Sequence, residues 1–317
     1  MFKNLFVLTF FLLVNLIFDS FFHSKILDEP KHIVVQQGMK LDDITEILFE
    51  NEIIKNKLAF KIWIKLNFYE KKLKYGEYFF HKKLSILDVS NKLVSGNSIH
   101  RKLTIIEGSY KYNLLQTLKQ IDPNTNLSLI DIPDNIIANT YSYELTDSAE
   151  RIISNILDLS SKYADKIWDK RNKRIPLQDV SEMFVLGSIV EKETSLKREK
   201  SIIAGVFFNR LEKKMRLQSD PTVEFSITKG QKKLGRSLLR KDLKFASDFN
   251  TYLNFGLPPS PICFPGIESL NGVVNPYKSD FLYFVSNNTD GGHFFSSNYK
   301  DHLKKIRHIK SMKKNGN

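Results

Sequence analysis

Cysteine is almost absent from this chain of 317 residues, which holds one cysteine, Cys263, and two tryptophans. A single cysteine cannot close an intramolecular disulfide, and the lack of a cysteine cluster excludes a cysteine-based zinc site. Histidine offers no substitute, because His293 stands at no metal-ligand spacing from His302 or His308. We therefore predict no metal and no cofactor, and we interpret Cys263 as a small buried hydrophobic residue.

Nucleic-acid-binding motifs are also lacking, although the chain is strongly basic. It has 48 Lys and Arg against 35 Asp and Glu, a formal net charge of +13, so attraction to a polyanion is expected. The basic residues are spread along the chain, with the densest run at residues 304–314, and neither a zinc-finger pairing nor an aromatic RNA-binding signature occurs. We predict no nucleic-acid partner, which leaves anionic lipid or the cell wall.

One long hydrophobic run is present, at the amino terminus. Residues 5–22 are nearly all apolar and reach the length of about 18 residues that crosses a bilayer as a helix. Lys3 precedes the run, so the positive-inside rule places the start in the cytoplasm and the chain after about Lys25 outside. The end of the run is too bulky for a signal-peptide cleavage site. We predict a retained anchor, residues 1–24, and a single-pass protein of the cytoplasmic (inner) membrane whose remainder lies on the outer, periplasmic side.

Residues 30–120 are predicted to form a small α+β module. Short apolar runs indicate strands at His32–Val35, Gly76–Phe80 and Leu103–Ile106. Apolar residues spaced three and four apart indicate amphipathic helices at Leu41–Leu48, Ala59–Leu66, Ser85–Val94 and around Leu114–Leu118. The order of strand, glycine turn and helix occurs twice, which suggests a weak internal repeat.

A second domain of mixed α/β structure is predicted for residues 151–317, after a connecting segment at 121–150 that is rich in Asp, Asn, Pro and Ser. Helices are expected at Ser148–Trp168, Val180–Val190, Glu199–Lys213 and the basic carboxyl terminus, and a strand at Phe281–Val285. The stretch from Gly256 to Pro276 is predicted to be loop. The fold class is therefore α+β, with a transmembrane helix, a small module and a larger mixed domain.

Two carboxylates, Glu191 and Glu193, end the helix that Asp179 is predicted to cap. This helix is apolar on nearly every face and should be buried all round. At about 100° per residue the two glutamates diverge by roughly 200°, so they cannot flank one glycosidic bond as a paired acid and nucleophile would. At most one transfers a proton, and a carboxyl among apolar side chains has a raised pKa that keeps it protonated near neutrality.

A run of ordered motifs resembles one known family. The segments LGSIVEKET, VFFNRL, MRLQSDPTV, FNTY, GLPPSPICFPG, FLYFV and GGHFFS are similar to the endolytic murein transglycosylases of the YceG-like family, over about residues 180–300. VVQQGMKLDDITEIL, GEYFF and IIEGSYKYNLL are similar, more loosely, to the LysM-like part of that family. The module at 30–120 is accordingly expected to be LysM-like.

The resemblance implies a lytic transglycosylase that cleaves the β-1,4 bond between N-acetylmuramic acid and N-acetylglucosamine and leaves a 1,6-anhydromuramyl end, which terminates or trims nascent strands. A glutamate of the EKE motif is catalytic in that family, and the correspondence with the Glu-Ser motif of soluble lytic transglycosylases assigns the acid to Glu193. Glu191 is expected to support it. The residues expected to position the substrate or to support those that do are Asn209, Gln218, Asp220, Thr222, Asn250 and Tyr252. Peptidoglycan glycan strands and peptidoglycan synthases are the implied partners.

Two other interpretations fit the same residues. The first is a membrane-anchored protein that binds peptidoglycan or acts as a cell-wall scaffold without turnover. The second is an ordinary hydrolase in which water, and not the C6 hydroxyl of the muramyl residue, attacks the sugar. The products released from the wall distinguish the three.

Overall fold

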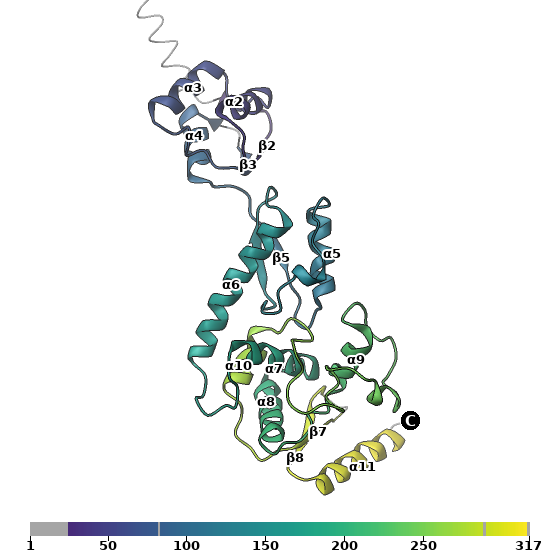
Figure 1. Ribbon diagram of the computed structural model, residues 1–317. Helices are drawn as coiled ribbons and strands as arrows, with labels where there is room; N and C mark the ends of the chain where they lie inside the picture. The colour runs from purple at the N-terminus through teal and green to yellow at the C-terminus, as the bar shows by residue number, and fades with distance from the viewer. Residues whose placement is uncertain (1–24, 82, 288–289, 316–317) are drawn as a thin grey trace, which may run out of the picture. The chain divides into compact units, whose positions relative to one another are not determined.

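The structure, a computed structural model, describes residues 25–81, 83–287 and 290–315. Contacts divide the chain into two compact units. The first unit runs up to Leu103 and includes Ser142–Asp147, and the second contains Thr104–Tyr141 and the chain from Ser148 onward (Figure 1). Within the described ranges no helix is both long and apolar enough to cross a membrane. The predicted anchor at residues 1–24 lies outside these ranges.

The first unit packs three helices with two antiparallel pairs of strands. Strand β2 (Lys31–Val35) pairs with β3 (Gly76–Phe80), and β1 (Lys25–Ile26) pairs with β4 (Lys83–Leu84). The helices are α2 (Leu41–Glu50), α3 (Lys57–Leu66) and α4 (Ile86–Ser95). Their apolar faces meet in a core that contains Leu48, Phe60, Ile64, Tyr78, Phe80 and Leu93. The helices and strands predicted here are confirmed.

Local signals explain where α4 begins and ends. The Ser85 hydroxyl accepts a hydrogen bond from the backbone of Asp88, whose carboxylate accepts from the backbone of Ser85 in return, and this reciprocal cap satisfies two free amides of the first turn. Gly96 follows the last turn with φ +71°, a left-handed conformation that favours glycine. The predicted glycine stop is confirmed.

The second unit contains residues that the sequence grouped with the first module. Strand β5 (Arg101–Thr104) begins two residues before the predicted Leu103 and pairs with β6 (Thr140–Tyr143). Helix α5 (Lys111–Ile121), the 3₁₀ turn η1 (Leu129–Asp131) and helix α6 (Ala149–Asp169) follow. Ile136 and Ile137, inside the predicted connecting segment, are fully buried, so this segment contributes to the packing of the second unit.

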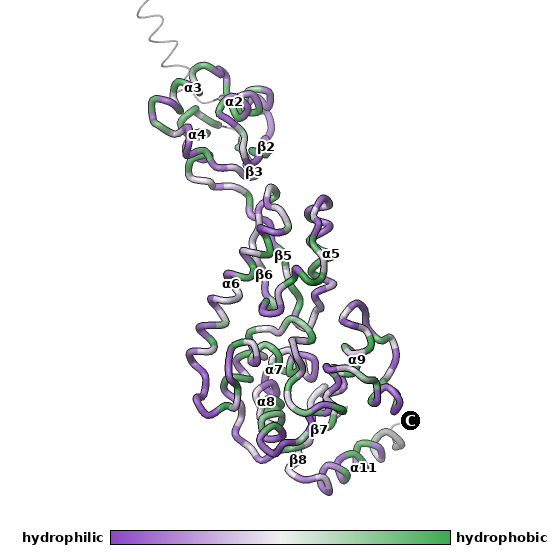
Figure 2. The backbone as a smooth tube through the Cα atoms, viewed as in Figure 1, coloured by the Kyte–Doolittle hydropathy of each residue, from purple (hydrophilic) through white to green (hydrophobic). Residues whose placement is uncertain are grey.

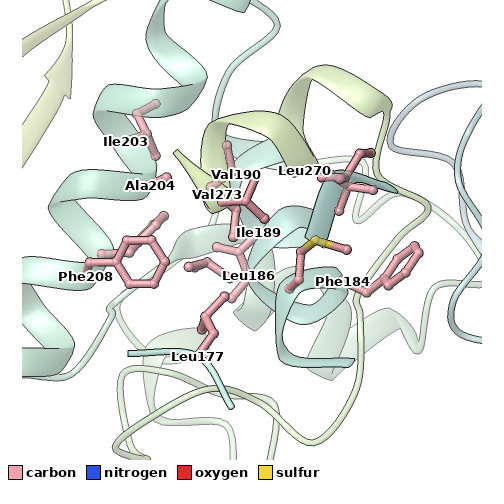
Figure 3. Packing of buried hydrophobic residues seen from close by; sticks show 14 of the residues in the cluster. Leu177, Phe184, Leu186, Ile189, Val190, Ile203, Ala204, Phe208, Leu270 and Val273 are labelled. Carbon is pink, nitrogen blue, oxygen red and sulfur yellow. The ribbon is translucent and has the colours of Figure 1, made fainter. Parts of the chain in front are cut away.

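Helix α7 (Val180–Glu193) is the centre of the second unit's core. Its residues 183–190 are all buried, which confirms the prediction of a helix buried on every side. It packs against α8 (Lys197–Glu212) and α10 (Ile267–Val274), where hydrophobic residues gather (Figures 2 and 3). Gly205 of α8 has no room for a side chain, because a Cβ would lie 2.5 Å from the carbonyl oxygen of Tyr277.

The remaining elements depart from the sequence analysis in three places. Helix α9 (Asp220–Thr228) was not expected, and it can begin here because Pro221 fits the first turn of a helix, where its missing amide costs no bond. Helix α10 lies within the stretch predicted to be loop, since eight residues give too little periodicity to detect. Strand β7 is Tyr283–Ser286, two residues later than predicted, and pairs with β8 (His293–Ser296) before α11 (Tyr299–Asn315).

Candidate active site

The end of α7 directs its two glutamates into different surroundings. Glu193 accepts a hydrogen bond from the Ser219 hydroxyl at 2.6 Å. Glu191 accepts from Lys200 Nζ at 2.9 and 3.0 Å, from the Gly266 amide at 2.9 Å and from the Ser269 hydroxyl at 2.6 Å. No partner is shared in these bonds, so the predicted divergence of the two carboxylates is confirmed.

Burial gives the Glu193 carboxyl an unusual acidity. Its pKa is raised from 4.5 to about 7, chiefly because burial disfavours the charged form. The Ser219 hydrogen bond lowers the pKa, the negative charge of Asp220 raises it, and the positive charge of Arg210 lowers it. The expected raised pKa is therefore present. Its largest cause is the loss of water around the buried carboxyl.

The Glu193 carboxyl borders a groove of about 540 Å³. One wall is the stretch Ile106–Tyr110 with Asn113, a second is the end of α7 from Glu191 to Ser195, and a third is Gln231–Lys233 after α9. Glu193 itself is partly exposed. A group that is mostly desolvated, but still reachable, has the geometry that a proton donor to a bound substrate requires.

Tyr110 is held in place in the groove wall from two sides. Lys192 Nζ lies 4.5 Å from the centre of its ring and donates to the carbonyl of Gly108. On the other side Gly230 lies so close that a Cβ there would be 3.2 Å from the ring. Gly230 has φ +67°, so glycine suits both the backbone and the space. These contacts hold Tyr110, which is largely buried, in the wall of the groove.

Ser219 is positioned by backbone bonds to a threonine across the unit. Its amide donates to Thr251 Oγ1 at 3.0 Å, and the amide of Gln218 donates to the Thr251 carbonyl at 3.1 Å. Thr222, one turn further along α9, donates its hydroxyl to the Ser219 carbonyl at 2.7 Å. The chain before α9 is thus fixed to hold the Ser219 hydroxyl against Glu193.

The six other site residues predicted from the sequence differ in what their side chains contact. Asp220 and Tyr252 lie beside Glu193: the Tyr252 hydroxyl donates to Asp220 at 2.6 Å, and burial followed by this bond raises the pKa of the tyrosine. Gln218 has an exposed side chain and a left-handed backbone, φ +51°. The other three bind backbone: Thr222 as above, Asn250 through the carbonyls of Leu243 and Phe245, and Asn209 through those of Ser279 and Phe281.

Sequence reasoning overlooked three residues that shape the site, namely Ser219, Arg210 and Tyr110. Arg210 is buried and donates to the carbonyls of Leu217 and Leu282, which places a positive charge near Glu193. Ser219 carried a signal, since a serine before Asp-Pro often precedes a helix. Tyr110 carried none, because it lies 83 residues before Glu193.

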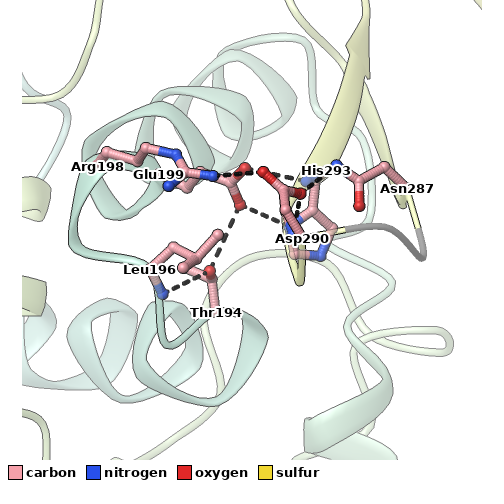
Figure 4. A network of polar contacts seen from close by, with 8 residues as sticks. Thr194, Leu196, Arg198, Glu199, Asn287, Asp290 and His293 are labelled. Carbon is pink, nitrogen blue, oxygen red and sulfur yellow. Dashed lines mark hydrogen bonds and ion pairs between the residues drawn. The ribbon is translucent and has the colours of Figure 1, made fainter.

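A second polar network lies beyond Thr194, which also borders the groove. The Thr194 hydroxyl contacts Glu199 at 3.4 Å, and Glu199 accepts from the amide of His293 at 2.9 Å and lies 2.7 Å from its Nδ1 (Figure 4). Asp290 accepts from Arg198 at 2.7 Å. The network fixes the β7–β8 hairpin to the start of α8. His293 is the first residue of β8.

Metal binding has no obvious place in this arrangement. Among the residues that the structure describes, no three His, Cys, Asp or Glu side chains gather so that they could hold a metal ion. Cys263 is buried, donates to the Ser188 carbonyl, and has a pKa raised by burial. Its interpretation as a small buried residue is confirmed.

Comparison with known proteins gives matches over nearly the whole chain. The sequence pattern of the YceG-like family matches residues 33–308. A Bacillus subtilis (strain 168) protein named endolytic murein transglycosylase is 29% identical, over 92% of this chain and 91% of its own. A protein of the same name from Streptococcus pneumoniae serotype 2 (strain D39) is 26% identical, over 87% of this chain and 58% of its own. The crystal structure of a yceG-like protein from Listeria monocytogenes is 28% identical, covers 87% of this chain and 99% of its own, and has a TM-score of 0.49.

Proposed function

We propose that this chain, which belongs to the YceG-like family, is an endolytic murein transglycosylase that cuts peptidoglycan glycan strands. Relatives with that name match over most of its length. The single observation that carries the chemistry is Glu193, a carboxyl with a pKa of about 7 at the edge of a groove. The bond cleaved is the β-1,4 linkage from N-acetylmuramic acid to N-acetylglucosamine.

Glu193 acts twice in the proposed reaction. Its protonated carboxyl donates to the glycosidic oxygen as the bond from that oxygen to C1 of the muramyl residue breaks, and N-acetylglucosamine leaves as an alcohol. The Glu193 carboxylate then takes the proton from the muramyl C6 hydroxyl as this oxygen bonds to C1 and closes the 1,6-anhydro ring. A pKa of about 7 suits both steps near neutral pH, because neither protonation state is strongly favoured.

One carboxylate suffices because the nucleophile belongs to the substrate. Glu191 is not available for proton transfer in this scheme, since a buried lysine, an amide and a hydroxyl all bind it. Ser219 tunes Glu193, and Asp220 and Tyr252 position the sugars next to it. Asn209, Gln218, Thr222 and Asn250 act through the backbone that carries these groups.

For the rest of the chain we propose the domain organisation that the sequence predicts. Residues 1–24 form a single-pass anchor in the cytoplasmic membrane, residues 30–120 a LysM-like module, 121–150 a connection and 151–317 the catalytic domain on the outer side. Residues 106–113 belong to the catalytic part as well, because they form one wall of the groove. Peptidoglycan synthases at the same membrane are the proposed partners, since nascent strands emerge there.

Digestion of purified peptidoglycan sacculi tests this function. The soluble products are analysed by mass spectrometry, with Glu193→Gln and Glu191→Gln as a matched pair of variants. We expect anhydromuramyl ends from the unaltered protein and none from Glu193→Gln. Ends that carry reducing muramic acid would indicate a hydrolase. Retention on sacculi without any release would indicate a binding or scaffold protein and refute the enzymatic proposal.

A further inference from the structure

Helix α3 of the first unit exposes a line of large hydrophobic side chains. Its apolar residues Leu58, Ile62 and Leu66 recur every fourth position, and they are 66%, 42% and 70% exposed, whereas Phe60 and Ile64 on the opposite side are fully buried. Figure 2 shows hydrophobic and hydrophilic residues alternating along this helix. Residues at this spacing form one stripe along a helix. A contiguous exposed apolar stripe in a soluble unit marks an interaction surface.

Phe68, two residues after the end of α3, is also exposed. It is 83% exposed and has φ +54°, a left-handed conformation that is unfavourable for a bulky residue. The backbone is fixed there by bonds from the Phe68 amide to Lys65 and from the Tyr69 amide to Ile64. A large aromatic side chain is therefore exposed to solvent at a position whose backbone conformation is unfavourable. We call Leu58, Ile62, Leu66 and Phe68 the α3 face.

Lysines lie next to this face. Residues 55–74 include seven lysines and one acidic residue, Glu70, and Lys57, Lys61 and Lys65 form a stripe of their own beside the apolar one. Lys57 binds Glu46 and Lys61 binds Asp42 on α2. When these two acids and Glu70 are subtracted, a charge of +4 remains. Apolar side chains flanked by lysines favour a membrane surface, where anionic headgroups lie above apolar acyl chains.

The chain length before the first unit limits where this face can lie. The apolar run ends at Phe22, and the first core residue of the unit is Leu27. Five residue steps span at most about 18 Å. A unit of this size has a radius of gyration of about 12 Å, so its diameter exceeds the tether. If the run is the membrane anchor proposed above, one face of the unit must lie against the bilayer.

We propose that the α3 face lies in the headgroup layer of the outer leaflet of the cytoplasmic membrane. The adjacent lysines bind anionic lipid there. Lipid acyl chains and the headgroup boundary offer aliphatic side chains such as Leu66 a more apolar surrounding than a hydroxyl-rich glycan strand does. Contact with lipid would fix the first unit at the membrane surface. This inference depends on the proposed anchor but not on the proposed chemistry.

Site-specific fluorescence in the full chain tests it. In a Cys263→Ser background, an environment-sensitive dye is attached at Leu66→Cys or Phe68→Cys and, as a control, at Gln37→Cys. Gln37 is exposed in the turn between β2 and α2 and is not part of the α3 face. Each protein is reconstituted in vesicles of phosphatidylethanolamine and phosphatidylglycerol. Flotation confirms that the chain is bound, and release of anhydromuramyl ends is measured separately.

We expect blue-shifted emission and quenching by lipid-attached quenchers at positions 66 and 68, and neither at position 37. The shift should weaken in phosphatidylcholine vesicles and in a Lys65→Gln/Lys71→Gln variant, because both remove the electrostatic part of the contact. Equal emission at all three positions in protein that floats with the vesicles would overturn the α3 contact and leave the anchor intact. Failure to float would overturn the anchor and the contact together, whereas the release assay would still report on the chemistry.

Discussion

The two sides of the end of α7 differ in what they do with a carboxylate. On one side Glu191 is 5% exposed and is neutralised by Lys200, itself 2% exposed. On the other side Glu193 accepts a hydrogen bond from the neutral Ser219 hydroxyl and borders the groove. A structural ion pair and a titrating acid can therefore stand two residues apart at the end of one helix, because burial has opposite consequences with and without a neutralising partner.

The largest expected effect comes from removing the acid. Glu193→Gln should lower the rate of strand cleavage by about 10² to 10⁴, the range that general acid-base catalysis contributes, and should leave the protein folded. Cleavage is measured as anhydromuramyl ends released per time, and folding as the urea midpoint. Unchanged cleavage in this variant, with loss in Glu191→Gln, would reverse the roles of the two sides.

Removing the cation on the other side should instead damage the fold. Lys200→Met leaves Glu191 buried without its counter-charge, a change that costs about 3–5 kcal/mol of unfolding free energy. Urea unfolding checks this value, and the double variant Glu191→Gln/Lys200→Met should recover part of the loss. A stable Lys200→Met protein with abolished cleavage would mean that the pair serves catalysis directly.

A smaller effect is expected from Ser219→Ala, which sharpens the comparison at Glu193. The hydrogen bond from Ser219 stabilises the charged form of Glu193, so the pKa of Glu193 should rise further when the variant removes this bond. A hydrogen bond to a charged group contributes about 1.5–3 kcal/mol, so the high-pH limb of the rate profile should move visibly to higher pH. Ser226→Ala is the matched control, because this buried α9 serine binds only the Thr222 carbonyl. Identical profiles for the two variants would refute the role of Ser219.

The sequence predicted the local features of the site but not the contacts between distant segments. The helix α7, its burial and the divergence of its glutamates follow from local periodicity, which a sequence displays directly. Lys200, Ser219 and Tyr110 could not be placed, because their roles depend on which segments meet in space. Helices α9 and α10 were overlooked because nine and eight residues show little periodicity, and Pro221 indicates a turn as readily as a helix start.

Stability as a function of pH offers a separate test of the raised pKa of Glu193. Folding raises the pKa of Glu193 from 4.5 to about 7, so the folded protein binds this proton more tightly than the unfolded chain does. The free energy of unfolding should therefore decline as the pH rises from about 4.5 to about 7. Glu193→Gln should reduce that decline, whereas Ser226→Ala should retain it. Urea unfolding at a series of pH values measures both, and equal slopes in Glu193→Gln and the unaltered protein would contradict the assignment.

The most direct measurement is the titration of Glu193 itself. The side-chain carboxyl is observed by ¹³C NMR in glutamate-labelled protein and assigned by the signal that Glu193→Gln removes. The account predicts a midpoint near 7 for this carboxyl, so that it can give a proton and then take one back at neutral pH. A midpoint at the ordinary value of 4.5 would leave Glu193 unprotonated at neutral pH and would contradict its role as the acid.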